Sequence, residues 1–110
     1  MSDFSNDAAF RGAVDTVFNT LAEQVDTVDY DEFEPRLTAG GLGIYFDSGD
    51  VVLLSQQTPT HEIWLSANYT AWHFLCRNGQ WVERDSNENM LVILSSILSE
   101  KFQESVALHL

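Results

Sequence analysis

The spacing of the apolar residues in this chain changes twice, and this change limits the folds that are possible. Near the N-terminus they recur every three or four positions, which predicts a helix with one buried face. That face consists of Phe10, Val14, Val17, Phe18, Leu21, Val25 and Val28. The spacing returns after Asp85 and predicts a second helix, with Ser86 or Asn87 as its N-cap. Its core face consists of Met90, Ile93, Leu94, Ile97 and Leu98.

Between the two helical segments, short strand-like runs are separated by turn-forming residues. The predicted strands cover residues 42–46, 51–54, 63–66, 72–77 and 80–84. Asn78-Gly79 is the preferred pair for a type I′ hairpin turn, and Pro59, which lacks a backbone N–H, marks another connection. With a helix at each end of one meander, we expect an α+β fold. In this two-layer sandwich the two terminal helices pack on one face of a five- to six-stranded antiparallel sheet.

The rest of the chain fits one compact unit. No repeat or linker divides the sequence, so we expect a single domain over residues 1–110. A hydrophobic content of 45% is enough for a packed core. The alternation of Val106, Leu108 and Leu110 predicts an extended, partly buried tail. Cys76 is the only cysteine and cannot form an internal disulfide, which fits a reducing compartment.

The charge balance limits the possible partners. The net charge is −12, from 17 acids against 5 bases. Nucleic acids and anionic membranes need positive protein charge, so neither is an expected partner, whereas cations and basic protein patches are. No apolar run reaches the length of a membrane span, and the acidic N-terminus lacks the chemistry of a targeting peptide. We therefore expect a cytosolic protein.

An acidic run stands out at the end of the first predicted helix. Six carboxylates with no Lys or Arg among them fall within twelve residues: Glu23, Asp26, Asp29, Asp31, Glu32 and Glu34. Because the run continues a helix and leads into strand-like sequence, it is expected to be held on folded structure. A metal ion or a basic partner could relieve its self-repulsion. The alternative is a solvated face that only aids solubility, which is what most charge runs are.

Trp64 is the residue of interest on the predicted sheet. In a strand, Ile63 and Leu65 share one face, while Trp64 shares the other with Glu62 and Ser66. If Ile63 and Leu65 point into the core, Trp64 points to solvent and can anchor a partner. The alternative is that Trp64 packs on an aromatic residue of a neighbouring strand, such as Trp72 or Trp81. The spacing alone favours neither.

A set of motifs extends from about Phe10 to the end of the second helix. It comprises the helix with an acidic back, residues 29–34, Gly40-Gly41-Leu42, the segment from Gln57-Thr58-Pro59 to Ile63-Trp64-Leu65-Ser66, and Trp81 followed by Asp85. Together these motifs resemble the frataxin family, and the short N-terminus resembles its bacterial, cytoplasmic branch. The resemblance implies an iron-binding regulator or iron donor of iron–sulfur cluster assembly. It also implies docking on a cysteine desulfurase and its scaffold protein.

The resemblance assigns roles to individual residues. The iron ligands would be Glu23, Asp26, Asp29, Asp31, Glu32 and Glu34. The partner-binding residues of the sheet face would be Trp64, Glu62 and Gln57. Two departures stand out: Ala22 and Thr27 replace acids that family members often carry on the helix, and Glu62 replaces an amide of mitochondrial members.

The ligand chemistry predicts weak iron binding. Carboxylates suit Fe(II) with water in the remaining positions, so Mn(II), Co(II) and Ca(II) should compete. His61 and His73 are possible extra ligands, although a lone strand histidine is more often structural. Two other functions stay open, a weak ferroxidase or iron store, and an acidic adaptor whose metal binding is incidental. A nucleophilic enzyme fits poorly, because no base accompanies Cys76. We expect a monomer.

Overall fold

The computed structural model describes residues 3–28 and 32–110 of the chain. Its helices are α1 (Asp7–Asp26) and α2 (Met90–Phe102), and a short 3₁₀ turn covers Thr58–Thr60. Its strands are β1 (Phe33–Thr38), β2 (Gly41–Phe46), β3 (Val51–Gln57), β4 (Glu62–Ala67), β5 (Thr70–Arg77) and β6 (Gln80–Glu83). None of the helices in these residues is long and apolar enough to cross a membrane.

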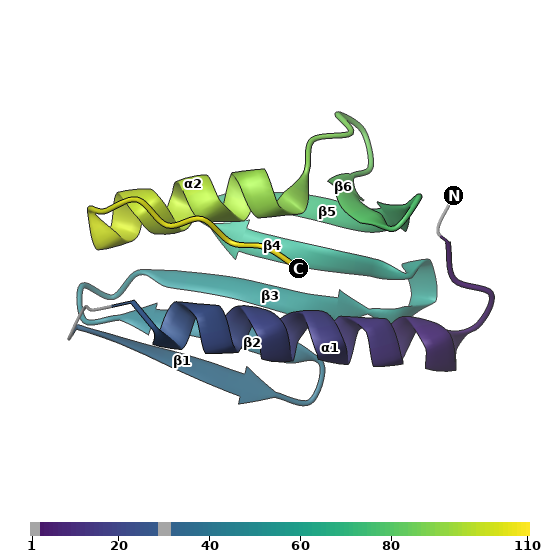
Figure 1. The fold of residues 1–110 in the computed structure, drawn as a ribbon, viewed down its shortest axis with the longest axis horizontal. Helices are drawn as coiled ribbons and strands as arrows, with labels where there is room; N and C mark the ends of the chain where they lie inside the picture. The colour runs from purple at the N-terminus through teal and green to yellow at the C-terminus, as the bar shows by residue number, and fades with distance from the viewer. Residues whose placement is uncertain (1–2, 29–31) are drawn as a thin grey trace.

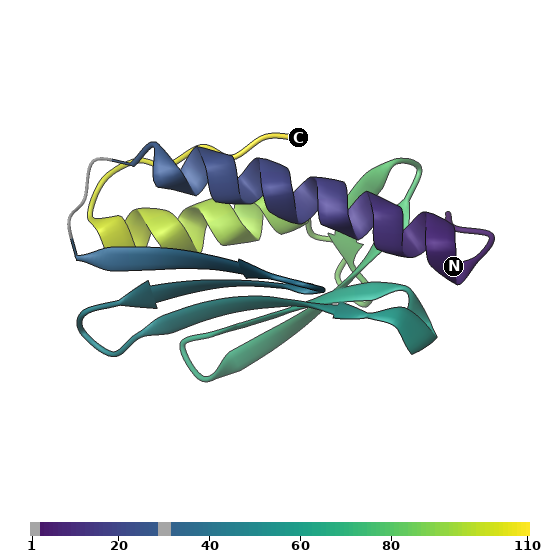
Figure 2. The ribbon, with the colours of Figure 1, turned by 90° about the horizontal axis from the view of Figure 1, so that it is seen from below.

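The described strands form one sheet covered by helices on a single side. The strand order is β1-β2-β3-β4-β5-β6, and each neighbouring pair is antiparallel. Figure 1 shows α1 and α2 side by side in front of the sheet, and Figure 2 shows the same two layers edge-on. The predicted α+β sandwich, with two terminal helices on one face of an antiparallel sheet, is confirmed.

The core lies between the helices and the inner face of the sheet. α1 contributes the buried residues Phe10, Val14, Val17, Phe18, Leu21 and Val25. α2 contributes Met90, Leu94, Ile97, Leu98 and Phe102. The register sets Leu42, Leu54 and Leu65 side by side across β2, β3 and β4, and all three are buried. Neither of the two described helices lies on the other face of the sheet, which carries the exposed residues discussed below.

Two tight turns join neighbouring strands of the sheet through residues with positive φ. Asn78 and Gly79 have φ values of 53° and 78°, as a type I′ turn requires, which confirms the predicted hairpin. Asn68 and Tyr69, at φ 54° and 61°, form a second tight turn that the sequence does not signal because it lacks glycine. Pro35 lies in β1, which pairs only with β2 and is therefore an edge strand that tolerates proline.

The cap of α2 differs from the sequence prediction. Asn89 is the N-cap, with extended backbone (φ −72°, ψ 130°), and its side chain accepts the Leu91 N–H at 2.8 Å. The predicted Ser86 and Asn87 are wrong for a physical reason. Asn87 has a φ of 63°, whereas an N-cap residue is extended, and Ser86 Oγ accepts the Glu88 N–H in the turn before the helix rather than an N–H of α2.

The C-terminal tail lies along the two helices as an extended segment (Figure 1). Leu108 is buried, and its N–H donates to Ser95 Oγ at 3.0 Å. The Gln24 side chain donates to the His109 carbonyl at 2.6 Å and accepts the His109 N–H at 3.0 Å. Ser99 Oγ accepts the Val106 N–H at 2.9 Å. The predicted extended, partly buried tail is therefore confirmed, and side chains replace a strand as its hydrogen-bond partners.

Candidate functional site

The helical half of the acidic run is exposed on the last turns of α1. Glu23 and Asp26 line a groove of about 300 Å³ together with Pro35 and Leu37 of β1. Leu37 is 45% exposed, which is high for a leucine beside a core. Neither carboxylate forms an ion pair with a described Lys or Arg. These two acids are therefore free to meet a cation from solvent.

Glu34 lies on the other side of β1. It faces the open side of the sheet, opposite Tyr45 of β2, and accepts two hydrogen bonds from Arg36, at 2.9 and 3.1 Å. The hydrogen bond with Glu34 raises the pKa of Arg36. The Arg36 guanidinium lies 4.4 Å from the centre of the Tyr45 ring, in cation–π geometry. Glu34 is thus engaged by a base of its own strand.

Glu32 is exposed just before β1, at the end of the sheet that also holds the turn between β2 and β3. Its carbonyl accepts the Asp47 N–H at 2.9 Å. Glu32 lines a cavity of about 260 Å³ with Asp50, Glu100 and Lys101. Lys101 is already bound there, to Asp50 at 3.0 Å and to Asn68 at 2.6 Å. Glu32 therefore lies beside acids that the sequence did not associate with it.

The predicted iron ligands do not converge on one point within the described residues. Glu23 and Asp26 lie on the helix layer, Glu34 on the open face of the sheet, and Glu32 at the end between them. Residues 3–28 and 32–110 contain no group of three or more Asp, Glu, His or Cys side chains arranged to hold a metal ion. The predicted ligands Asp29 and Asp31 lie outside the described residues. The described acids can offer a cation one or two carboxylates at a time, with water completing its shell.

Trp64 is 37% exposed on the open face of the sheet. It lies opposite Ser55 of β3 and His73 of β5. Its ring centre is 4.6 Å from that of His73 at an interplanar angle of 62°, an edge-to-face contact. Its Nε1–H donates to Glu62 Oε1 at 3.0 Å. Trp64 thus points to solvent and also has an aromatic neighbour, His73, in place of the expected Trp72 or Trp81.

The other two predicted partner-binding residues are less accessible. Glu62 is only 4% exposed, and its carboxylate also accepts from Thr60 Oγ1 at 2.9 Å. Arg84 Nη1 lies 3.5 Å from Glu62 Oε2. Gln57 is half-buried, and its amide donates to Ser55 Oγ at 3.3 Å. Their direct contact with a partner stays a prediction, but little of Glu62 is left to make one.

Two exposed apolar residues enlarge the Trp64 surface beyond the prediction. Val51 and Leu53 of β3 are each 39% exposed on the open face. Leu53 pairs with Ser66, which is the next residue after Trp64 on the same face of β4. The run of apolar residues 51–54 has no period-two signal, so the sequence alone does not show which members face solvent. The pairing register of β3 with β4 shows that Leu53 lies opposite Ser66, on the face that Trp64 also occupies.

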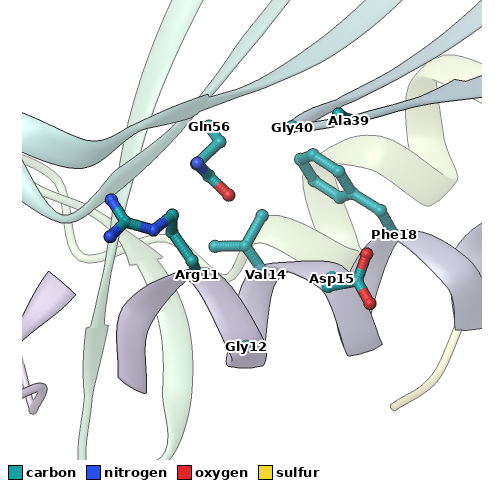
Figure 3. A pocket seen from close by; sticks show the side chains of 8 residues that line it. All are labelled: Arg11, Gly12, Val14, Asp15, Phe18, Ala39, Gly40 and Gln56. Atoms are coloured by element: carbon teal, nitrogen blue, oxygen red, sulfur yellow. The ribbon is translucent and has the colours of Figure 1, made fainter. Parts of the chain in front are cut away.

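A cavity elsewhere contains none of the predicted site residues. Its volume is about 430 Å³, and it lies between the first half of α1 and the turn that joins β1 to β2. Figure 3 shows the side chains of Arg11, Asp15 and Gln56 around it, with Gly40 at its sheet side. It is therefore separate from both the acidic run and the Trp64 surface.

The histidines and the cysteine have structural partners. His61 Nε2 lies 2.7 Å from Asp7 Oδ1, and its ring stacks on Phe10 at 4.8 Å. Cys76 is 6% exposed, and burial raises the pKa of its thiol to about 11, with a further contribution from the neighbouring Asp3 carboxylate. A neutral, buried thiol is neither a nucleophile nor a ready metal ligand at neutral pH.

The fold of this chain is similar to the folds of known proteins. In solved structures the fold resembles that of frataxin from Psychromonas ingrahamii, a member of the CyaY protein family. The TM-score is 0.84 at 22% identity, covering 93% of this chain and 96% of that one. Trimeric frataxin from Saccharomyces cerevisiae with its full-length N-terminus gives 0.69 at 16% identity, covering 94% and 85%. The yeast trimer complexed with ferrous iron gives 0.68 at 17% identity, covering 94% and 92%. The model of the frataxin-like domain matches residues 3–104, and the chain therefore belongs to the frataxin family.

Proposed function

We propose that this protein binds iron weakly and regulates, or donates iron to, iron–sulfur cluster assembly on a cysteine desulfurase and its scaffold protein. The frataxin family generally binds iron and is linked to iron–sulfur assembly. The observation that carries the proposal for this chain is the exposed acidic run. Glu23, Asp26 and Glu32 are exposed, and none forms an ion pair with a described base. The protein would act in the cytoplasm as a monomer.

Iron would reach the acidic run as transient cargo. The ligands would come from Glu23, Asp26, Asp29, Asp31 and Glu32, while Glu34 would contribute less because Arg36 neutralises it. Scattered carboxylates favour hard divalent cations without distinguishing strongly among them. The same negative edge would attract a basic patch of the desulfurase, and the ionic part of that attraction would fall as salt is added.

An anaerobic Fe(II) titration followed by amide NMR tests the metal half of the proposal. Signals from residues 23–34 should broaden or shift first. The double variant Glu23→Gln/Asp26→Asn should weaken the effect on the helical part of that range. Asp15→Asn is the matched control, because it removes one exposed carboxylate from the same helix outside the run. If Fe(II) leaves residues 23–34 unperturbed, metal binding at this edge is refuted.

Affinity for the desulfurase tests the partner half. Trp64→Ala and the neutralised acidic run should each weaken binding, and only the effect of the acidic run should diminish with added salt. Val92→Ala is the control, since Val92 is 69% exposed on α2, away from the open sheet face. Equal desulfurase affinities of the wild type and both variants would refute the partner proposal.

A second candidate is an acidic adaptor in which metal binding is incidental. It is favoured by the absence of a converging set of metal ligands among residues 3–28 and 32–110. In that case desulfurase binding would be the same with Fe(II) present or chelated. A ferroxidase would instead consume oxygen when Fe(II) is added in air, which an oxygen electrode measures directly.

A further inference from the structure

Glu62 is the one charged residue that is buried within the described part of the chain, at 4% exposure. A buried carboxylate is costly unless hydrogen bonds and a counter-charge compensate it. Here one oxygen accepts from Thr60 Oγ1 at 2.9 Å and from Trp64 Nε1 at 3.0 Å. The other oxygen faces Arg84 at 3.5 Å. Both carboxylate oxygens therefore have partners within the protein, and these partners include Trp64 on the open face of the sheet.

The same contacts determine which part of the Trp64 side chain a partner can contact. Glu62 and Trp64 are two residues apart in β4, so their side chains share one face. The hydrogen bond to Glu62 engages the indole N–H, and the edge-to-face contact with His73 holds the ring from the neighbouring strand. The part of Trp64 left for solvent is its apolar ring, beside the exposed Leu53.

We infer that Glu62 is a positioning residue, which holds the Trp64 ring in a fixed orientation and does not itself contact the partner. This inference rests on the proposed function, in which the open sheet face binds another protein. It identifies the partner surface by its chemistry. That surface is an apolar or aromatic pocket that accepts a ring, without a hydrogen-bond acceptor for the indole N–H. Binding through Trp64 is then insensitive to salt, unlike binding through the acidic run.

The first test needs no partner. In an NMR spectrum of the indole N–H groups, Trp64→Phe identifies the Trp64 signal among the three tryptophans. Glu62→Ala removes the acceptor, so the Trp64 indole proton should shift upfield and exchange faster with water. Glu62→Gln retains an oxygen acceptor and should leave both properties near those of the wild type. An unchanged Trp64 signal in Glu62→Ala overturns the positioning role.

The second test measures desulfurase affinity. Glu62→Ala should lower it about tenfold, the equivalent of roughly 1.4 kcal/mol, which is the order of one hydrogen bond to a charged group. Glu62→Gln should stay within about threefold of the wild type, because the indole still has its acceptor. Glu88→Ala, which removes a charge from an exposed loop, is the matched control. If Glu62→Gln loses as much as Glu62→Ala, the charge of Glu62 contacts the partner and the inference is wrong.

A double-mutant cycle shows whether Glu62 acts through Trp64. Trp64→Phe keeps an aromatic ring but lacks the N–H, so it breaks the same hydrogen bond and should lose about as much affinity as Glu62→Ala. Glu62→Ala should cost no further affinity in the Trp64→Phe background. An undiminished cost there refutes action through Trp64. If Trp64→Ala leaves binding unchanged, the sheet-face proposal itself fails; if it weakens binding while Glu62→Ala does not, only this inference fails.

Discussion

Replacing Leu108 by alanine is the sharpest test of the packing between the C-terminal tail and the two helices. Leu108 is 9% exposed and belongs to the core cluster. The change removes the equivalent of three CH₂ groups, and at about 0.8 kcal/mol each this gives roughly 2.4 kcal/mol. A residual cavity adds to the cost, although the tail can settle partly into the space. We therefore expect a loss of about 2–3 kcal/mol.

Leu110→Ala is the matched control, since the same residue type two positions later is 56% exposed. It should change stability by less than about 0.5 kcal/mol. A domain of this size has roughly 5–15 kcal/mol of stability, so the Leu108→Ala loss is a large share of it. Urea unfolding followed by circular dichroism measures both variants, and the melting temperature of Leu108→Ala should fall by about 10–20 °C. Equal stabilities would mean that the tail does not pack on the helices in solution.

Three further predictions concern other parts of the fold. The Asp3 carboxylate accepts the Gly79 and Asn78 N–H groups, at 2.8 and 3.1 Å, and the bond from Gly79 contributes most to lowering its pKa. Its stabilising contribution should therefore be complete above the ordinary aspartate pKa near 3.8 and vanish as the pH falls through the lowered value. Asp3→Asn should then be less stable than the wild type at pH 7, and the gap should close in acid unfolding curves; a gap that does not depend on pH contradicts this. Because the thiol pKa of Cys76 is raised to about 11, iodoacetamide at pH 8 should modify native protein far more slowly than urea-unfolded protein, and equal rates would contradict its burial. Gly43→Ala should cost about 1–3 kcal/mol in urea unfolding, because the new methyl carbon would lie 2.6 Å from the Tyr45 ring, and a neutral effect would show that the ring moves freely.

Local chemistry made much of the fold predictable. The spacing of apolar residues identifies both helices, and Asn78-Gly79 identifies one hairpin, because these signals depend on neighbouring residues only. Asn68-Tyr69 forms the same kind of turn without glycine. Asn tolerates the positive φ, but Tyr69 does not favour it, and the pairing of β4 with β5 over six residue pairs stabilises the backbone there. That contribution is non-local and cannot be read from the dipeptide.

The candidate site was less predictable, because it depends on which face each residue occupies. In the sequence Glu23 and Glu34 belong to one acidic run, but the strand in which Glu34 lies turns it to the opposite side of the sheet from α1. The neighbour of Trp64 is likewise decided by register, which sets His73 beside it. Arg36, two residues after Glu34, neutralises a predicted ligand through a contact that only the strand geometry makes evident.

Both edges of the sheet are poor templates for adding another strand. On one side, Pro35 interrupts the outer row of N–H donors of β1, and the charged Glu34 and Arg36 flank it. On the other, β6 has only four residues, and Val82 is already bridged to Asn89. Concentrated protein is therefore protected from edge-to-edge growth of a shared sheet, the first step of many fibrous aggregates. Self-association of this chain would have to use side-chain surfaces, where charge repulsion from a net −12 opposes it.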